Sequence, residues 1–222
     1  MVGCVLGCRV QPPAFVPPDS NVLFRDEFSG ATLEAGWTFT GEDPTRESLT
    51  ERPGFMRITA QDAASTKPSL LLRDISGDFV LTARMEFDPA PDRLLAGLVV
   101  QGEDGRTVTL GLLHASGTRG TFRGVLALAD PGGGAPVDRA AGAYDSTEVY
   151  LRLERRGADF DASYSQDGVT YTPVGTVTAG LSDAVQVGIG AAASEHCNSR
   201  CDVASPADFD FFEIGAVGNA GG

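Results

Sequence analysis

One stretch near the middle of the chain alternates apolar and polar residues so regularly that it requires antiparallel strands. The alternation runs from Val149 to Glu154 and breaks at Arg156-Gly157. A period of two is typical of a strand with one buried and one wetter face. A second alternation covers Phe160 to Tyr164. The Gln166-Asp167-Gly168 segment then favours a tight turn, and strand is expected to continue through Val169, Tyr171 and the run from Val174 to Val177. The pattern predicts a three-stranded antiparallel meander.

The rest of the chain repeats this pattern of short alternating runs separated by turn residues. No run shows the spacing of a helix with one apolar face, so the sequence predicts an all-β fold, a two-sheet antiparallel jelly-roll sandwich. The first and last predicted strands are both aromatic and acidic, and we expect them to pair, because the first and last strands of jelly rolls often do. Asp130 to Ala143 contains three consecutive glycines and predicts a mobile loop. Further strands are expected at Val22–Phe28, Phe55–Ala60, Leu70–Leu72, Phe79–Asp88, Ala96–Gln101, Thr107–His114, Phe122–Ala129, Val185–Ala192 and Asp208–Ile214.

Length and charge limit the organisation and the partners. The 222 residues suggest one β-sandwich domain over 22–216, with a tether over 1–21 and a short flexible tail over 217–222. We expect a monomer. The net charge of −13 argues against a nucleic-acid partner, and no apolar run is long enough for a transmembrane span.

The first residues contain a partial export signal. Val5-Leu6-Gly7-Cys8 resembles the bacterial lipobox, in which the final cysteine is lipidated, and a proline-rich segment follows it. The basic start of such a signal is missing, so a plain N-terminus with incidental thiols is the alternative. If Cys8 is lipidated, the protein is extracytoplasmic, at the cell surface or in the periplasm, and held by a lipid anchor.

A second cysteine pair lies near the C-terminus. Cys197 and Cys201 bracket three polar residues, and we expect them to form a disulfide in an exported chain. A zinc site with His196 is the alternative, although the spacing matches no common zinc pattern.

Several segments, taken in order, resemble a known family. They include Asp26–Gly30 with Trp37, Arg52–Ile58, Gly77-Asp78-Phe79, and the closing Phe209–Phe212. This order is similar to the concanavalin A-like lectin/glucanase superfamily, and most closely to the C-terminal module of family 43 β-xylosidases and to DUF1349 proteins. The resemblance implies a concanavalin A-like fold from about residue 22 to 214. Because these residues contain no catalytic propeller, it does not imply the hydrolase activity.

The sequence contains no complete catalytic motif. Glu86 and Asp88 match two of the three carboxylates of laminarinase-like enzymes, and Glu154 is a further weak candidate. Glu86 and Asp88 are also ordinary cross-strand partners for arginines, which is the simpler interpretation. Ser165–Tyr171 nearly matches a sialidase Asp-box, but its glycine comes one residue early, which favours a structural turn.

Sugar binding needs exposed aromatic rings beside planar polar groups. Tyr150, Arg152 and Glu154 share the polar face of one predicted strand, and we expect Gln101 and Thr109 on neighbouring strands of the same face. Trp37 is the alternative anchor. Either Trp37 belongs to the core and the three strand residues form an ion pair under a tyrosine, or this face binds a glycan.

The first and last predicted strands carry four acidic residues, Asp26, Glu27, Asp208 and Asp210. Because we expect these strands to pair, the carboxylates predict a structural calcium site, and solvated acidic edges are the alternative. No cofactor is required by any motif.

Three functions remain open from the sequence. The first is an exported, surface-tethered, non-catalytic module that binds an oligo- or polysaccharide. The second is a glycoside hydrolase or polysaccharide lyase, and the third is a structural or protein-interaction domain of the cell envelope.

Overall fold

A computed structural model describes residues 21–41, 43–60, 68–89, 92–117, 120–130, 138–193 and 205–218. The predicted all-β fold is confirmed, with a single 3-10 turn, η1 (Pro44–Arg46), in the described part. No helix in that part is long and apolar enough to cross a membrane. The strands are β1 (Val22–Asp26), β2 (Thr38–Thr40), β3 (Glu47–Ser48), β4 (Met56–Thr59), β5 (Ser69–Ser76), β6 (Phe79–Phe87), β7 (Asp92–Gln101), β8 (Thr107–Gly117), β9 (Gly120–Asp130), β10 (Asp138–Ala143), β11 (Glu148–Arg156), β12 (Asp159–Ser165), β13 (Thr172–Thr178), β14 (Ala184–Ala193) and β15 (Pro206–Gly215).

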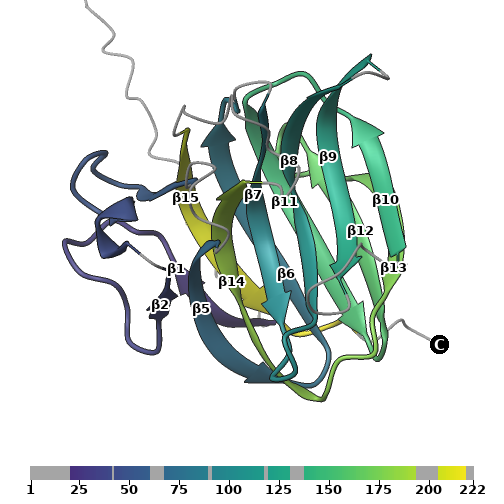
Figure 1. The fold of residues 1–222 in the computed structure, drawn as a ribbon. Coiled ribbons are helices and arrows are strands. Elements are labelled where there is room, and N and C mark those ends of the chain that lie inside the picture. Colours follow the sequence, from purple (N-terminus) through teal and green to yellow (C-terminus); the bar gives the residue numbers. More distant parts are fainter. Residues whose placement is uncertain are drawn as a thin grey trace, which may run out of the picture.

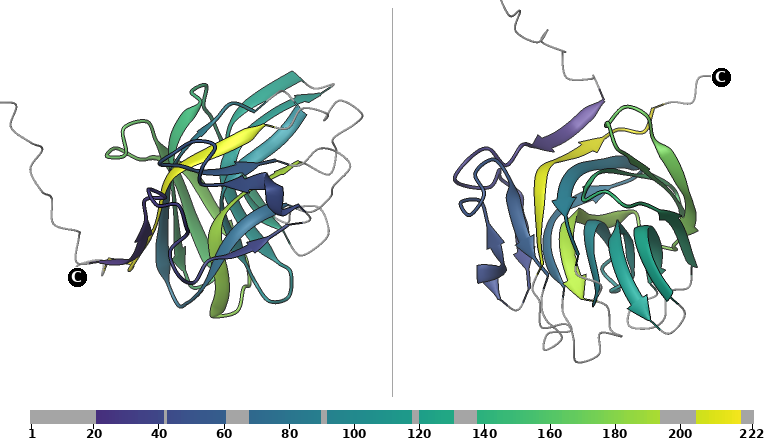
Figure 2. Two further views of the ribbon diagram at one scale, coloured as in Figure 1. Left: turned by 90° about the vertical axis from the view of Figure 1, so that its left-hand side faces the viewer. Right: turned by 90° about the horizontal axis from the view of Figure 1, so that it is seen from above.

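The strands form two antiparallel sheets that lie face to face (Figures 1 and 2). The first sheet, called sheet A, has the order β13-β12-β11-β6-β15-β4-β3, and β1 pairs with β15 beside this path. The second, sheet B, has the order β10-β9-β8-β7-β14-β5-β2. Each of the two sheets therefore has an inner face toward the other sheet and an outer face.

Two predictions about strand pairing are confirmed. Strands β11, β12 and β13 are consecutive neighbours in sheet A, as the meander requires. The first and last strands pair antiparallel, with Phe24 opposite Ile214 and Asp26 opposite Phe212. The first and last strands therefore lie side by side, and the early strands (purple to blue in Figure 1) lie beside β15.

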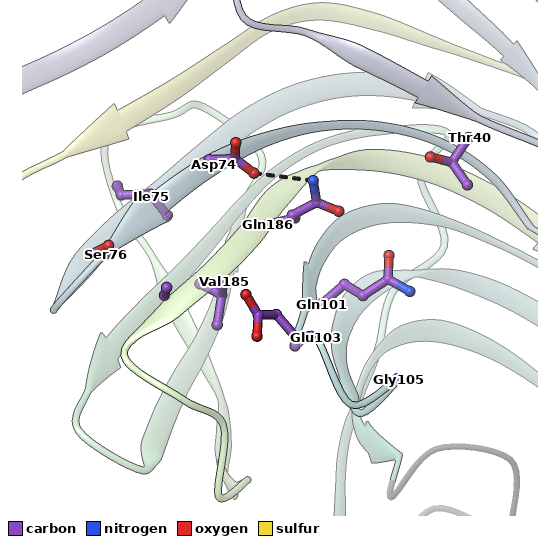
Figure 3. A pocket seen from close by; sticks show the side chains of 11 residues that line it. Thr40, Asp74, Ile75, Ser76, Gln101, Glu103, Gly105, Val185 and Gln186 are labelled. Atoms are coloured by element: carbon purple, nitrogen blue, oxygen red, sulfur yellow. Dashed lines mark hydrogen bonds between the residues drawn. The ribbon is translucent and has the colours of Figure 1, made fainter.

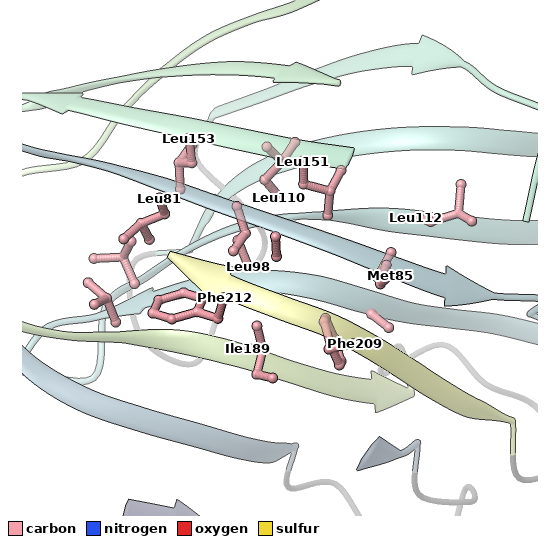
Figure 4. Packing of buried hydrophobic residues seen from close by; sticks show 14 of the residues in the cluster. Leu81, Met85, Leu98, Leu110, Leu112, Leu151, Leu153, Ile189, Phe209 and Phe212 are labelled. Carbon is pink, nitrogen blue, oxygen red and sulfur yellow. The ribbon is translucent and has the colours of Figure 1, made fainter. Parts of the chain in front are cut away.

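The core lies between the inner faces of the sheets (Figure 4). The alternation predicted for β6 is confirmed, because every second residue from Phe79 to Phe87 is buried and the residues between are partly exposed. Leu81 and Met85 of β6, together with Leu151 of β11, face Leu98 and Ile189 of sheet B (Figure 4). Burial of these side chains provides the main driving force for folding.

The structure corrects two strand predictions. Part of the expected loop Asp130–Ala143 is strand β10, whose alanines and glycine pair with β9. Small residues carry a weak strand signal, and the hydrogen-bonded pairing with β9 makes the strand favourable. Val169 was expected in a strand but is 82% exposed in the turn before β13.

Candidate functional site

The residues of the predicted ligand face are divided between the two sheets, so the prediction that they share one face is wrong. Tyr150, Arg152 and Glu154 lie in β11 of sheet A, whose neighbours are β6 and β12. Gln101 and Thr109 lie in β7 and β8, which belong to sheet B. Both groups alternate with core residues and therefore face outward, on opposite sides of the sandwich. Strand order decides this, and strand order is not visible in local periodicity.

Arg152 and Glu154 form an ion pair within one strand. The Arg152 Nη2 atom lies 3.2 Å from Glu154 Oε2, and Arg156 Nη2 lies 2.5 Å from the other Glu154 oxygen. The Tyr171 ring lies beside the Arg152 guanidinium, 5.8 Å from its carbon. Arg152 and Glu154 also line a cavity of about 270 Å³ with residues of β12 and β13. This side of sheet A therefore remains a small second candidate.

Trp37 is a structural residue and not an open sugar platform. Its ring packs against Phe24, Phe28 and Phe212, with the closest ring centres 5.1 Å apart. Its Nε1 donates to Asp26 Oδ2 at 2.9 Å. The alternative that Trp37 belongs to the core is the one the structure supports.

The three weak catalytic candidates are each paired with arginine, and they do not form one group. Glu86 lies 2.9 Å from Arg52 and 3.6 Å from Arg84. Asp88 follows the end of β6 and pairs with Arg123 of β9 at 3.1 Å. Glu154 pairs as described above. Ion pairing is the ordinary role of such carboxylates on a sheet surface.

The four predicted calcium ligands have separate partners. Asp26 accepts hydrogen bonds from Phe28 N at 2.8 Å and from Trp37, and Glu27 pairs with Arg25. Asp210 lies 2.8 Å from Arg84. Among the described residues, no three acidic, histidine or cysteine side chains gather as a metal site. The strands pair as expected, but the structure does not bring these carboxylates together.

Asp208 shows how two arginines neutralise one of these carboxylates. It is 6% exposed and accepts two hydrogen bonds from Arg57, at 2.7 and 2.8 Å, and one from Arg52 at 2.9 Å. Burial opposes its ionisation, but the hydrogen bonds from Arg57 and Arg52 outweigh burial and lower the pKa of Asp208. The two guanidinium groups already supply the positive charge that a cation would provide.

The segment that resembled an Asp-box is a structural turn, as the early glycine indicated. The Asp167 carboxylate accepts hydrogen bonds from Val169 N and Thr170 N, both at 2.8 Å. Ser165 Oγ donates to the same carboxylate and accepts from Gly168 N at 3.0 Å. All of these groups serve the backbone of the turn.

The cysteines Cys8, Cys197 and Cys201 lie outside the described residues, and so does His196. The disulfide, zinc and lipidation hypotheses therefore stay predictions from the sequence.

A larger cavity, of about 740 Å³, opens at one end of sheet B (Figure 3). We call it the sheet B cleft. Five segments supply its walls: β2, β5, β7, β14 and the turn after β7. The described residues that line it are Thr40, Asp74, Ile75, Ser76, Gln101, Gly102, Glu103, Gly105, Ala184, Val185 and Gln186.

A row of polar side chains crosses the cleft on three neighbouring strands. Asp74 of β5 is opposite Gln186 of β14, which is opposite Gln101 of β7. Gln186 Nε2 donates to Asp74 Oδ1 at 3.0 Å, and this bond orients the Gln186 amide (Figure 3). Glu103 approaches the row from the turn, where Gly105 N donates to Gly102 O at 3.1 Å.

The cleft has a distinct chemical character. Its described lining holds two amides, two carboxylates and the hydroxyls of Thr40 and Ser76, but no lysine, arginine or aromatic residue. The next outward-facing positions on β5 and β7, Leu72 and Val99, are buried. The polar row therefore lies next to buried apolar side chains on the same strands, and it can form hydrogen bonds in a fixed direction.

Among the residues that line this site, only Gln101 was a candidate from the sequence. Asp74 lies in β5 beyond the predicted strand Leu70–Leu72, and Gln186 lies at a polar position of the predicted strand Val185–Ala192. Their alternation with apolar residues was a usable signal for an outward orientation. Their proximity depends on β14 lying between β5 and β7, which no local pattern reveals.

One known protein family matches nearly all of the described sandwich. The family described as "Beta xylosidase C-terminal Concanavalin A-like domain" matches residues 25–215. No curated protein sequence matches the chain.

Similar solved structures share the fold at low sequence identity. The GH43 protein BlXynB from Bacillus licheniformis is 19% identical, with a TM-score of 0.71 over 90% of this chain and 40% of that one. A protein titled "Bacteroides ovatus Xyloglucan PUL GH43B" is 24% identical, with a TM-score of 0.67 over 92% and 41%. The xylan beta-1,4-xylosidase from Bacillus halodurans C-125 is 22% identical, with a TM-score of 0.67 over 86% and 39%. The chain thus spans about two fifths of the length of these structures.

Proposed function

The chain belongs to the family of β-xylosidase C-terminal concanavalin A-like domains, and from this premise we propose that it is a non-catalytic module that binds a neutral oligo- or polysaccharide in the sheet B cleft. The observation that carries the proposal is the row Asp74–Gln186–Gln101 across three neighbouring strands. Planar amides and carboxylates held at strand spacing can form paired hydrogen bonds with the hydroxyls of successive sugar units.

The charge of the cleft selects the class of glycan. Asp74 and Glu103 are its only charged side chains among the described lining residues. A polyanionic chain such as a polyuronate would meet like charge with no basic residue to compensate, so a neutral chain is favoured. Without an aromatic ring in the lining, binding rests on hydrogen bonds and aliphatic contact. We therefore expect weak binding, with a Kd of about 1 mM, which corresponds to about −4 kcal/mol.

Isothermal titration calorimetry with xylohexaose, cellohexaose and oligogalacturonate tests the proposal. We expect the neutral oligosaccharides to bind and the anionic one not to bind. Gln101→Ala and Gln186→Ala should each weaken binding about tenfold, because each removes paired hydrogen bonds from a preformed row. Arg152→Ala on the outer face of sheet A is the matched control and should leave binding unchanged.

The other outcomes separate the competing functions. Loss of binding only in Arg152→Ala would move the site to the 270 Å³ cavity of sheet A. If the wild type releases reducing sugar from the same substrates and Glu86→Gln or Glu154→Gln does not, the protein is a glycoside hydrolase. If no oligosaccharide binds and no reducing sugar is released, but a protein partner is captured from the cell envelope, the result would support a protein-interaction domain.

The proposal includes a location, which rests on the sequence alone. We propose that the protein is exported and tethered through Cys8. Metabolic labelling with a fatty acid tests this: the wild type should take up label in the membrane fraction, and Cys8→Ser should not.

A further inference from the structure

One buried arginine has no role in the site as described so far. Arg155 is the last inward-facing residue of β11 and is 4% exposed, in line with Val149, Leu151 and Leu153 on the core face. The rings of Phe79 and Phe160 lie on the opposite strands, each 5.8 Å from its guanidinium carbon. A buried guanidinium is costly unless its donors are satisfied.

The Arg155 donors bind backbone carbonyl oxygens, and no ion pair with a carboxylate is found for it among the described residues. Nε donates to Gly157 O at 3.1 Å, and Nη1 donates to Asp183 O at 3.2 Å. Nη2 donates to Ser182 O at 2.8 Å and to Leu181 O at 3.5 Å. Three of these four carbonyls belong to one segment, Ala179–Asp183, which carries the chain from β13 in sheet A to β14 in sheet B.

The other side of this connection contacts the wall of the cleft. Arg106 Nη1 donates to Gly180 O at 2.6 Å, and Arg106 follows the cleft turn Gly102–Gly105 directly. Leu181 packs so close to Gly102 that a Cβ atom at Gly102 would lie 3.2 Å from Leu181 Cδ2. The connection also continues into Ala184, Val185 and Gln186, which line the cleft.

We propose that Arg155 is a positioning residue for the sheet B cleft. It holds the Ala179–Asp183 connection from inside the sandwich, and this connection sets the place of both the Gly102–Gly105 turn and the start of β14. The proposal rests on the proposed function for its link to sugar binding. Its structural part, the coupling of Arg155 to the cleft wall, can be measured without a ligand.

Arg155→Lys is the decisive variant, because an ammonium keeps the charge but cannot reach four carbonyls arranged around a planar guanidinium. Arg106→Met is the second test variant. It removes the bond to the connection from its exposed side and leaves the buried Arg155 in place. Leu153→Val is the matched control, since it loosens the same core face of β11 but keeps the Arg155 guanidinium and its four carbonyl partners.

Amide hydrogen exchange and calorimetry with xylohexaose provide the two readouts. We expect Arg155→Lys and Arg106→Met to speed exchange at Gly102 and Gly105 about tenfold and to raise the xylohexaose Kd about tenfold. Leu153→Val should lower the melting temperature and leave both readouts unchanged. Unchanged exchange at Gly102 and Gly105 in Arg155→Lys, or equal changes in Leu153→Val, would overturn the proposal. If wild type does not bind xylohexaose, the proposed function fails, and the exchange data still decide the role of Arg155.

Discussion

Asp26 shows how one side chain organises the start of the domain. Its carboxylate accepts hydrogen bonds from Phe28 N at 2.8 Å, Glu34 N at 3.3 Å and Trp37 Nε1 at 2.9 Å. Phe28 has a left-handed φ of 49°, which is unusual for a residue with a side chain. The bond from its backbone nitrogen and the burial of its ring stabilise this conformation.

We predict that Asp26→Ala destabilises the protein by about 2–4 kcal/mol, because it leaves up to three donors without an acceptor in a partly buried site. Asp26→Asn keeps one oxygen and should cost less. Urea unfolding followed by the fluorescence of Trp37, the only tryptophan, measures both. Equal stability of Asp26→Ala and wild type would show that the carboxylate does not organise this region.

The stability that the Asp167 carboxylate contributes should depend on pH. Hydrogen bonds from Thr170 N and Val169 N, followed by the one from Ser165 Oγ, lower the pKa of Asp167 from 3.8 to about 2. Because the folded pKa is depressed, its contribution to stability is complete above pH 3.8 and is lost as the pH falls through about 2. The carboxyl ¹³C shift of Asp167 should titrate with a midpoint near that value. A midpoint at 3.8 would mean that the hydrogen bonds of the turn do not stabilise the ionised Asp167 carboxylate.

At the scale of elements, glycines allow close approach between the strands of sheet B. A Cβ atom on Gly97 would lie 2.1 Å from Leu110 O and 2.5 Å from the Cα of Gly111, its partner on β8. A Cβ on Gly188 would lie 1.9 Å from Leu71 O of β5. Backbone atoms of a paired strand cannot move aside as a side chain can, so these positions require glycine.

We predict that Gly97→Ala destabilises the protein by about 3 kcal/mol or more, because the added methyl group overpacks against the backbone of β8. Gly215→Ala in β15 is the control, since its Cβ would make ordinary contacts of 3.6 Å or longer. Thermal unfolding of the two variants should separate them clearly. Comparable melting temperatures would show that sheet B can relax around the new methyl group.

At the scale of the molecule, two sheets share one core and expose two different outer faces. Ion pairs cover the outer face of sheet A, where Arg84 contacts Glu148 at 3.0 Å and Asp210 at 2.8 Å. Arg25 pairs with Glu213 at 2.7 Å on the same sheet. Sheet B instead presents the cleft with its amides and carboxylates. The division of charge between the faces supports the assignment of ligand binding to sheet B.

We predict that the sandwich folds without residues 1–20. The first described contacts of the chain begin with Asn21, whose carbonyl accepts a bond from Ala216 N at 2.7 Å, and with β1, which pairs with β15. Deleting residues 1–20 should therefore change the melting temperature by less than about 2 °C. Removing residues 1–26 deletes β1 and should lower it by much more. A large loss from the shorter deletion would show that the tether packs on the domain.

The class of fold can be predicted from the sequence, because alternation is a local property of each strand. The faces of β6 and β11, the meander and the turn at Asp167 follow from neighbouring residues alone. The pairing of the first and last strands could be predicted from the fold class, because the first and last strands of jelly rolls often pair. The place of a ligand was beyond such reasoning. Tyr150 and Gln101 have the same outward pattern, yet they lie on opposite sides of the molecule. Only tertiary structure places β14 between β5 and β7, so that Asp74, Gln186 and Gln101 form one row, because contacts between distant strands depend on how the whole chain fills the core.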